Sequence, residues 1–348
     1  MSLPTKTAEY CLPKTTGIHD LTFREVPVQP PKANEVLVKI HAVSLNYRDI
    51  FIVEGKYPVV KPSVVPGSDA ACEVIAVGSD VKGWKPGDRV TASFALDHIH
   101  GDMTTAIQNT TLGGPIDGVL TQYRNFPAYS LVKMPENLSY EEAATLPCAA
   151  VTAWNALHGP RPVKAGDYVL VEGTGGVSIF ALQFAVASGA TVIATSSSNE
   201  KLEFAKKLGA TYTINYKEKP NWGEEAVKLT GGRGVDHVIE VGGAGTIKQA
   251  TQALKSGGGW LHGIGFLTGT KEELSVSDLI FLIMFRVGIY RSVGVGSIPQ
   301  FEDMNRLIES HNIRPIIDKV FPFDKTREAY QHLQSQKHVG KVVIKVSQ

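Results

Sequence analysis

The stretch that decides the fold lies near the middle of the chain, where residues 168–178 read YVLVEGTGGVS. Its first five residues form an apolar run typical of a buried strand, and a helical pattern follows the glycines. Gly173 permits a tight turn, and Gly175 lets the backbone approach a ligand closely. A helix that begins near Gly176 would direct free N–H groups and its positive dipole end at a phosphate. We interpret this loop as a pyrophosphate-binding turn; the alternative is a glycine-rich turn without a ligand.

The chain around this loop repeats the order strand, then helix. Val177 opens a predicted helix over residues 177–188, and the small side chain of Ser178 still permits close packing where a third glycine or alanine is usual. Further strands are predicted at residues 191–195, 213–215, 235–240 and 260–263, with helices between them, the first at 199–208. This alternation predicts an α/β fold with a doubly wound parallel sheet, a Rossmann dinucleotide-binding domain.

The first third of the chain has a different sequence pattern, typical of short strands and turns. Short β-like segments at residues 35–43, 72–77 and 89–92 are separated by turn signals rich in Pro, Gly and Asp. Many short strands with such punctuation predict a β-rich barrel or sandwich. Near the other end, a helix at 300–310 precedes a strand at 341–346, and that last strand could rejoin the first domain.

Composition sets the broad class. The chain has 348 residues, 43% of them hydrophobic, and a formal net charge of +1. This length suggests two domains, and the near-neutral charge predicts no nucleic-acid or anionic-membrane partner. Three widely spaced cysteines give no disulfide framework, so we expect a soluble protein of the cytoplasm. The most apolar run, residues 279–285, is far too short to span a membrane and predicts a buried helix or a dimer edge.

The second strand of the Rossmann pattern indicates which nicotinamide cofactor is preferred. NAD sites usually carry an acid there that binds the ribose 2′-hydroxyl, whereas this strand ends in Ser196 and Ser197. Lys201, one helical turn on, could add a positive charge, and Tyr216 after the third strand could add a hydroxyl. We therefore predict NADP(H). The alternative interpretation of Lys201 is a solvated helix residue, and that of Tyr216 is a half-buried loop aromatic.

Two later glycine clusters follow the fourth and fifth strands of the same sheet. They are Val241-Gly242-Gly243 and Gly263-Ile264-Gly265. Because ligands of doubly wound sheets bind at the carboxyl ends of the strands, we expect both loops to pass close to a nicotinamide ring. The alternative is ordinary turn chemistry.

Several short motifs accompany the glycine loop: residues 46–49 (NYRD), 66–69 (PGSD), 85–90 (KPGDRV), 146–147 (LP), 152–154 (TAW) and 340–344 (GKVVI). Together they resemble the medium-chain dehydrogenase/reductase superfamily over essentially the whole chain, and most closely its zinc-free, quinone-oxidoreductase-like branch. The resemblance implies a GroES-like catalytic domain, residues 1–130 and 294–348, around a Rossmann domain, residues 131–293. It also implies an active site in the cleft between them and often a homodimer.

The resemblance also bears on metal binding. Zinc-dependent members bind the metal through Cys, His and a third Cys or carboxylate, and the corresponding positions here are Asn46, Ser68 and Cys148, with Asp69 as a further oxygen donor. One thiolate with two such poor ligands does not make a catalytic zinc site. The segment that holds structural zinc in relatives, residues 96–123 here, has no cysteine. Its Asp97, His98, His100 and Asp102 could bind a metal, but we interpret them as a solvated polar loop, and we predict no metal. The segment as a whole could instead form a lid or a pocket wall.

Without a metal, hydrogen-bond donors must stabilise the charge that builds on a reduced carbonyl. The resemblance places Asn46 and Tyr47 there as donors, with Arg48 on an oxyanion or cofactor phosphate and Asp49 orienting it. It also places Thr152 near the nicotinamide. The alternative for the Arg48–Asp49 pair is a structural ion pair.

Three functions remain open at this point. The first is an NADPH-dependent, zinc-independent reductase of quinones or α,β-unsaturated carbonyls. The second is a zinc-independent carbonyl reductase or alcohol dehydrogenase acting on aldehydes or ketones. The third is an NADPH-binding protein with little turnover, because a fold does not fix a function.

Overall fold

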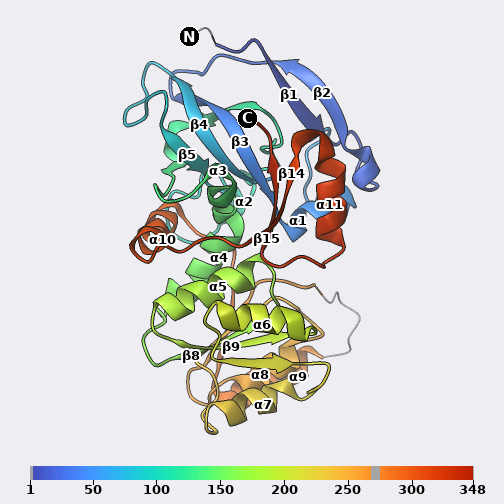
Figure 1. Ribbon diagram of the computed structural model, residues 1–348, viewed down its shortest axis with the longest axis vertical. Coiled ribbons are helices and arrows are strands. Elements are labelled where there is room, and N and C mark those ends of the chain that lie inside the picture. The colour runs from blue at the N-terminus through green and yellow to red at the C-terminus, as the bar shows by residue number, and fades with distance from the viewer. Residues whose placement is uncertain (1–2, 268–274, 348) are drawn as a thin grey trace. The chain divides into compact units, whose positions relative to one another are not determined.

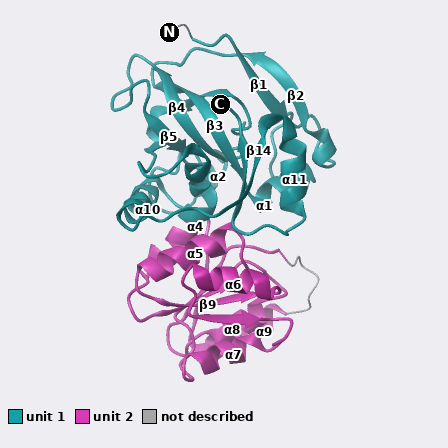
Figure 2. Ribbon diagram, in the orientation of Figure 1, with its two compact units in different colours: residues 1–151, 295–348 teal, residues 152–294 magenta. Residues whose placement is uncertain are grey.

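The computed structural model describes residues 3–267 and 275–347. The chain divides into two compact units (Figure 2). Unit 1 comprises residues 1–151 and 295–348, and unit 2 comprises residues 152–294. Each unit is built around its own sheet.

Unit 2 is built on a six-stranded sheet with the order β10-β9-β8-β11-β12-β13, and all its strand pairs are parallel. The strands are β8 (Tyr168–Glu172), β9 (Thr191–Ser196), β10 (Tyr212–Asn215), β11 (His237–Glu240), β12 (Trp260–Gly263) and β13 (Ile289–Ser292). The helices are α4 (Val151–His158, whose first residue belongs to unit 1), α5 (Gly176–Ala187), α6 (Asn199–Lys207), α7 (Trp222–Leu229), α8 (Ile247–Ala253) and α9 (Val276–Arg286).

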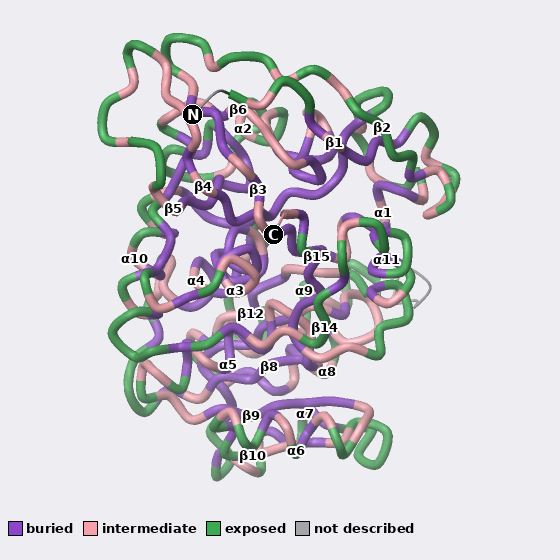
Figure 3. Tube along the Cα trace, turned by 45° about the horizontal axis from the view of Figure 1, so that its top comes forward, coloured by how far each residue is buried: buried purple, intermediate pink, exposed green. Residues whose placement is uncertain are grey.

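The strand order of unit 2 reverses at β8, because β9 pairs with one side of it and β11 with the other. Helices α5 and α6 pack on β8, β9 and β10, while α7, α8 and α9 pack together on the other face (Figure 1). The central strand β8 is buried along Val169–Val171, as expected for a strand covered on both faces (Figure 3). This is the predicted doubly wound Rossmann fold, and its reversal point is where such folds bind ligands.

Unit 1 has a mainly antiparallel seven-stranded sheet with the order β14-β15-β3-β4-β5-β7, to which β6 adds through β3; β1 and β2 form a separate hairpin. Its strands are β1 (Lys6–Cys11), β2 (Thr22–Pro27), β3 (Glu35–Leu45), β4 (Asp69–Val77), β5 (Arg89–Ala92), β6 (Tyr123–Pro127), β7 (Leu131–Lys133), β14 (Ile317–Pro322) and β15 (Lys341–Lys345). Its helices are α1 (Tyr47–Val53), α2 (Thr105–Gln108), α3 (Tyr140–Ala143), α10 (Ile298–Ser310), α11 (Thr326–Gln334), a π-helical turn (Leu146–Ala150) and 3₁₀ turns at Ile18–Asp20, Ala128–Ser130 and Phe323–Lys325.

The last strand of the chain joins the first domain, as the sequence indicated. β15 pairs antiparallel with β3, so that Val342 lies opposite Leu45. Lys341, the residue before Val342, is thereby brought beside the end of β3. This pairing sets up the polar cluster described below.

The predicted domain boundary at residues 130/131 is wrong. Residues 131–151 belong to unit 1. The physical reason is that β7 pairs with β5 in the sheet of unit 1, and that the Cys148 N–H donates to Asp69 on β4 at 3.1 Å. The second boundary lies at 294/295, one residue beyond the expected position.

The apolar run at residues 279–285 forms part of α9, but not as a buried helix. No residue of α9 is buried, and Val276, Phe281 and Phe285 are 73%, 66% and 76% exposed. The neighbouring strand β13 is the edge of the sheet. The buried-helix alternative is therefore wrong for the described residues of this segment. No helix among the described residues has the length and hydropathy needed to cross a membrane.

Candidate functional site

The glycine loop after β8 has the geometry of a phosphate-binding turn. Gly173 adopts φ +71°, a left-handed conformation that favours glycine, and its N–H donates to Thr195 O at 2.8 Å. Gly175 is the N-cap of α5, and Gly176 and Val177 begin that helix. A Cβ atom at Gly173 or Gly175 would meet no described atom within 4 Å, so the loop has an open side at the helix N-terminus. An anion placed there would face N–H groups and the positive helix end.

The predicted role of Ser178 as a small packing residue agrees with the structure. Its side chain is buried, and its hydroxyl donates to the carbonyl of Glu172 at 2.6 Å. The helix therefore lies close against the end of β8. Because the Ser178 hydroxyl has a hydrogen-bond partner within the protein, burying this polar group destabilises the fold little.

The end of β9 presents hydroxyls. Ser196 Oγ accepts from the N–H of Ser198 at 3.3 Å, and Ser198 in turn caps α6 by accepting from the Lys201 N–H at 3.4 Å. The Tyr216 N–H donates to the Ser196 carbonyl at 3.1 Å, and the tyrosine is 40% exposed. Ser197 lies between these contacts. The four predicted residues of this region therefore lie on the β9–α6 turn and on the adjoining end of β10, with Lys201 in the first turn of α6.

The loops after β11 and β12 pack on one another. A Cβ atom at Gly265 would lie 2.6 Å from the carbonyl oxygen of Val241, and one at Gly263 would lie 2.2 Å from the Tyr290 hydroxyl. The Ile264 N–H donates to the carbonyl of Glu240 at 2.9 Å. Close packing alone thus explains part of the glycine content. Both loops, including the buried Gly242, still lie at the carboxyl edge of the sheet, together with the loop after β8.

Thr152 precedes these loops in the sequence and is the second residue of α4. Its side chain is buried. Its predicted place near the nicotinamide stays a prediction.

In unit 1, Asn46 belongs to a buried polar cluster with Lys341, Ser68 and Asp69. Lys341 is 3% exposed, and its Nζ donates to the Asn46 Oδ1 and to the Leu45 carbonyl, each at 2.6 Å. Asn46 Nδ2 lies 3.3 Å from Ser68 Oγ, which donates to Asp69 Oδ1 at 2.6 Å. Elements distant in sequence meet here: the end of β3, the start of β4 and the start of β15.

The charged ends of this cluster fix the direction of every hydrogen bond in it. An ammonium only donates, so the amide atom facing Lys341 is the oxygen of Asn46, and its N–H groups face Ser68. A carboxylate only accepts, so Ser68 gives its proton to Asp69 and receives one from Asn46. Burial raises the pKa of Asp69, while the Lys341 charge and the hydrogen bonds from Ser68, Asn46 and the Cys148 N–H oppose that rise.

The other three predicted catalytic residues point in different directions. Tyr47 is half-buried, and its hydroxyl accepts from Gln336 Nε2 at 3.3 Å, which leaves its own proton to donate. Arg48 donates to the Leu112 carbonyl at 2.8 Å, and its guanidinium lies over the ring of Tyr57 at 4.4 Å. Arg48 therefore anchors the 111–114 segment.

Asp49 is fully buried and accepts from the Asn46 N–H at 2.8 Å, so that it caps the start of α1. Desolvation by burial raises the pKa of Asp49 to about 6. No ion pair within 4.0 Å joins it to Arg48 among the described residues. A capping role, in which Asp49 fixes the turn that presents Asn46, fits these contacts better than direct orientation of Arg48.

The residues at the metal position of zinc-dependent relatives do not fit zinc. Asn46 Oδ1 accepts a hydrogen bond from the Lys341 ammonium, and the Asp69 carboxylate accepts hydrogen bonds from Ser68 and from the Cys148 N–H. Desolvation by burial raises the pKa of the Cys148 thiol well above its ordinary value, which opposes the thiolate that zinc needs. Among the described residues no group of three or more His, Cys, Asp or Glu side chains could hold a metal ion.

Residues 96–123 pack into unit 1 and are not simply a solvated polar loop. His98 is 2% exposed, its Nε2 lies 2.9 Å from the Gly101 carbonyl, and its own carbonyl accepts from the Ile298 N–H. Asp97 accepts from the Tyr129 hydroxyl at 2.7 Å, whereas His100 and Asp102 are exposed. The prediction of a solvated loop is therefore wrong for His98, because its ring is needed to close this segment.

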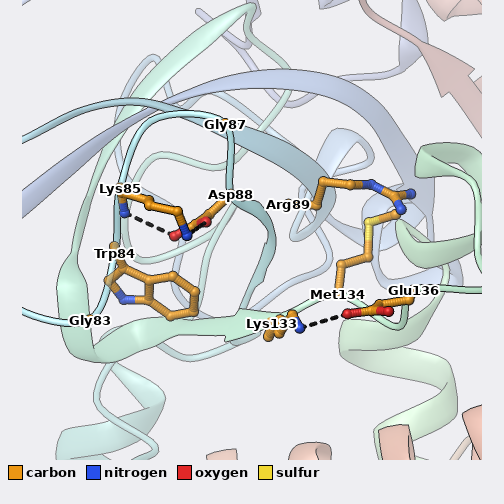
Figure 4. Close-up of a pocket in the computed structure, with 9 residues that line it drawn as sticks. All are labelled: Gly83, Trp84, Lys85, Gly87, Asp88, Arg89, Lys133, Met134 and Glu136. Carbon is orange, nitrogen blue, oxygen red and sulfur yellow. Dashed lines mark hydrogen bonds and ion pairs between the residues drawn. The ribbon is translucent and has the colours of Figure 1, made fainter.

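A surface depression of unit 1 lies away from these residues. A depression of about 520 Å³ is lined by the turn before β5 and by the end of β7 (Figure 4). Four of its charged side chains are paired, Lys85 with Asp88 and Lys133 with Glu136, and Arg89 donates to the Leu138 carbonyl. None of the predicted site residues lines it, so we assign it no role.

Sequence reasoning missed Lys341, Glu172 and Glu240. The two glutamates end β8 and β11, and both are buried beside the predicted cofactor loops. An acid as the last residue of a buried strand was a signal available in the sequence. Lys341 had no such signal, because only the pairing of β15 with β3 brings it to Asn46.

Comparison with known proteins agrees with this architecture. Residues 32–136 match the family model of the alcohol dehydrogenase GroES-like domain, and residues 176–310 match that of the zinc-binding dehydrogenases. A zinc-type alcohol dehydrogenase-like protein of Schizosaccharomyces pombe is 50% identical, over 95% of this chain and 96% of that protein. The chain belongs to the medium-chain dehydrogenase/reductase family. The predicted family and the predicted pair of folds are thereby confirmed, and the protein is an oxidoreductase that uses a nicotinamide cofactor.

Two further relatives show how varied the activities of this family are. A 2-haloacrylate reductase of Burkholderia sp is 28% identical, over 95% of this chain and 96% of that protein. The crystal structure of an NAD-dependent alcohol dehydrogenase is 31% identical, with a TM-score of 0.88, and covers 98% of this chain and 100% of that one. Membership of the family therefore leaves open both the substrate and the choice between NAD and NADP.

Proposed function

We propose that the protein is an NADPH-dependent, zinc-independent reductase that transfers hydride to an α,β-unsaturated carbonyl or a quinone. The observation that carries the proposal is the cluster of Asn46, Ser68, Asp69 and Lys341. It fills the metal position with a hydrogen-bonded network anchored by an ammonium group. A site of this kind offers hydrogen-bond donors where zinc relatives offer a Lewis acid.

In this proposal, the protein's own residues bind, orient and stabilise charge. The reduced nicotinamide supplies the hydride when it is bound. The N–H groups at Gly175 and Gly176 hold the pyrophosphate, and reduction builds negative charge on the substrate's carbonyl oxygen. We assign the stabilisation of that charge to the Asn46 amide N–H and the Tyr47 hydroxyl.

Replacing Asn46 by Asp tests this assignment. The substitution keeps the shape but replaces the amide donor by a carboxylate, which also repels a developing oxyanion, so we expect kcat to fall by at least about 10²- to 10³-fold, the usual cost of losing one oxyanion donor. The Kd for NADPH should stay unchanged. An equal loss of turnover and of NADPH affinity would assign Asn46 to folding or cofactor binding instead.

The preference for NADPH rests on the end of β9, where Ser196 and Ser197 replace the acid expected of an NAD site and Lys201 follows in the first turn of α6. We expect Ser197→Asp to weaken NADPH binding much more than NADH binding, because a carboxylate repels a 2′-phosphate. Gly175→Ala is the matched control, since a methyl group there should weaken both cofactors alike. A wild-type enzyme that favours NADH would refute the NADP assignment, and the NAD-dependent relative makes that comparison necessary.

The choice between C=C and C=O reduction is tested by product analysis with cinnamaldehyde, which offers both bonds to one hydride. A saturated aldehyde supports the proposed reductase, in line with the 2-haloacrylate reductase among its relatives. Cinnamyl alcohol favours the second candidate, a zinc-independent carbonyl reductase or alcohol dehydrogenase; alcohol dehydrogenases also occur among the relatives. NADPH binding without consumption across a wider panel of quinones and enones would favour a binding protein.

We also propose that the protein forms a homodimer through α9 and the edge strand β13. Ile280, Phe281, Met284 and Phe285 make an exposed apolar face on α9, and β13 has an unpaired edge among the described residues. Such a combination favours association. Phe285→Glu should shift sedimentation from dimer to monomer, and an unchanged sedimentation coefficient would refute this interface.

We propose that the protein is located in a reducing compartment such as the cytoplasm, because its three cysteines, Cys11, Cys72 and Cys148, are free thiols. Fluorescence microscopy of a tagged protein tests this placement.

A further inference from the structure

Two buried carboxyl groups lie side by side at the cofactor edge of the unit 2 sheet. Ile239 pairs with Val171 in the parallel ladder of β11 and β8, so Glu240 and Glu172 are the next residues along. Neighbours in register on parallel strands point to the same face of the sheet. Glu172 is 4% exposed and Glu240 is 2% exposed.

The carboxyl groups hold the loop that follows β11. Glu240 Oε1 accepts from the N–H groups of Gly242 at 3.0 Å and Gly243 at 2.8 Å, and from the Thr246 hydroxyl. Glu172 Oε2 accepts from the Val241 N–H at 3.3 Å. Three successive backbone N–H groups of the predicted cofactor loop are thus bound by two side chains.

The surroundings of the pair accommodate only one negative charge. Three donors surround Glu240 Oε1, whereas Glu172 Oε1 is buried and accepts no hydrogen bond from a described donor. Burial, then repulsion by Glu240 and a hydrogen bond to it, raise the pKa of Glu172 well above its ordinary value. Tyr290 on β13 also faces Glu240, whose charge adds to the effect of burial in raising the pKa of the phenol. None of the largest causes of the shift of Glu172 is a cation or a histidine.

We propose that Glu172 is a positioning residue that carries a proton, donates it in a hydrogen bond to Glu240, and thereby holds residues 241–243 in the conformation that receives the cofactor. This inference rests on the proposed function, because it takes the loop after β11 to be part of the nicotinamide site. Loss of the Glu172 proton places two buried negative charges next to each other, and the loop is released. Cofactor affinity therefore falls at alkaline pH.

The test compares wild type, Glu172→Gln and Glu203→Gln. Glutamine keeps the size of Glu172 and donates a hydrogen bond at every pH, while Glu203 is an exposed carboxylate on α6 paired with Lys206. NADPH Kd is measured by fluorescence between about pH 7 and about pH 10. We expect wild type and Glu203→Gln to lose up to about tenfold in affinity for each pH unit above the titration of the pair. Glu172→Gln should show a flat profile.

Hydrogen exchange of the loop amides separates this inference from the proposed function. In the cofactor-free protein, the amides of residues 241–243 should lose protection, after correction for intrinsic rates, at alkaline pH in wild type and not in Glu172→Gln. If NADPH fails to bind but exchange follows this pattern, the proposed function is wrong and the carboxyl pair still acts as described. Equal pH dependence of exchange in wild type and Glu172→Gln would overturn the inference.

Discussion

Replacing Lys341 by methionine is the sharpest test of the polar cluster in unit 1. Lys341 is 3% exposed, and methionine nearly preserves the volume of its stem but removes the ammonium. The Leu45 carbonyl and Asn46 Oδ1 each lose a donor at 2.6 Å, and the fully buried Asp69 loses its nearby positive charge. We expect the cofactor loops of unit 2 to be unaffected.

The magnitude follows from the burial of both charges. Removing one partner of a direct buried ion pair typically costs about 3–5 kcal/mol, whereas Lys341 and Asp69 are linked through Asn46 and Ser68. Asp69 keeps hydrogen bonds from Ser68 and from the Cys148 N–H, so we expect the lower end, about 3 kcal/mol. The lost charge also raises the folded-state pKa of Asp69 further above its unfolded value. A carboxyl group shifted in this direction lowers stability as pH rises, so the difference from wild type should grow above about pH 4.

The assay is hydrogen exchange of the β15 and β3 amides, because two units can unfold separately and a single melting temperature would mix them. Lys341→Arg is the control that keeps the charge. Lys341→Met with Asp69→Asn should recover most of the loss, because no uncompensated buried charge then remains. A loss below about 1 kcal/mol in Lys341→Met, or no recovery in the double variant, would refute the reasoning.

Three other predictions test separate parts of the molecule. Burial lowers the pKa of His237 to about 4, so the folded protein requires its neutral form, and the free energy of unfolding decreases as pH falls from about 6.5 towards 4. His237→Asn should remove up to about 3 kcal/mol of that decrease, measured by urea titrations at two pH values. Arg48→Met should speed limited proteolysis within residues 105–114, because the contact with the Leu112 carbonyl is lost, while Arg48→Lys restores it only partly. Gly175→Ala should leave the thermal stability of the cofactor-free protein within about 1 kcal/mol, because its Cβ meets no neighbour, yet weaken NADPH binding in calorimetry.

The sequence was most informative where local pattern and burial coincide. The strands at Tyr168–Glu172, Trp260–Gly263 and Arg89–Ala92 have the predicted bounds, because each is short and directly follows a glycine or an aspartate. The boundary at residue 130 failed because nothing local shows that β7 pairs with β5. Lys341 was missed for the same reason, since it lies 295 positions from Asn46 in the chain and only a strand register joins them.

The segment at residues 46–49 shows why a motif matched in sequence does not act as one site. Successive residues of a helix turn by about 100°, so four neighbours at the start of α1 cannot share one direction. Asn46 faces Ser68 and Lys341, Tyr47 faces Gln336, Arg48 reaches Leu112, and Asp49 turns back to cap the helix. Asn46 has a second amide hydrogen beyond the one that it gives to Ser68, and Tyr47 accepts from Gln336 and keeps its own proton to donate, so these two residues have the donors that our mechanism needs. Arg48 and Asp49 contribute by fixing the turn and the segment around those donors, so their substitution should affect stability and local order before it affects the chemical step.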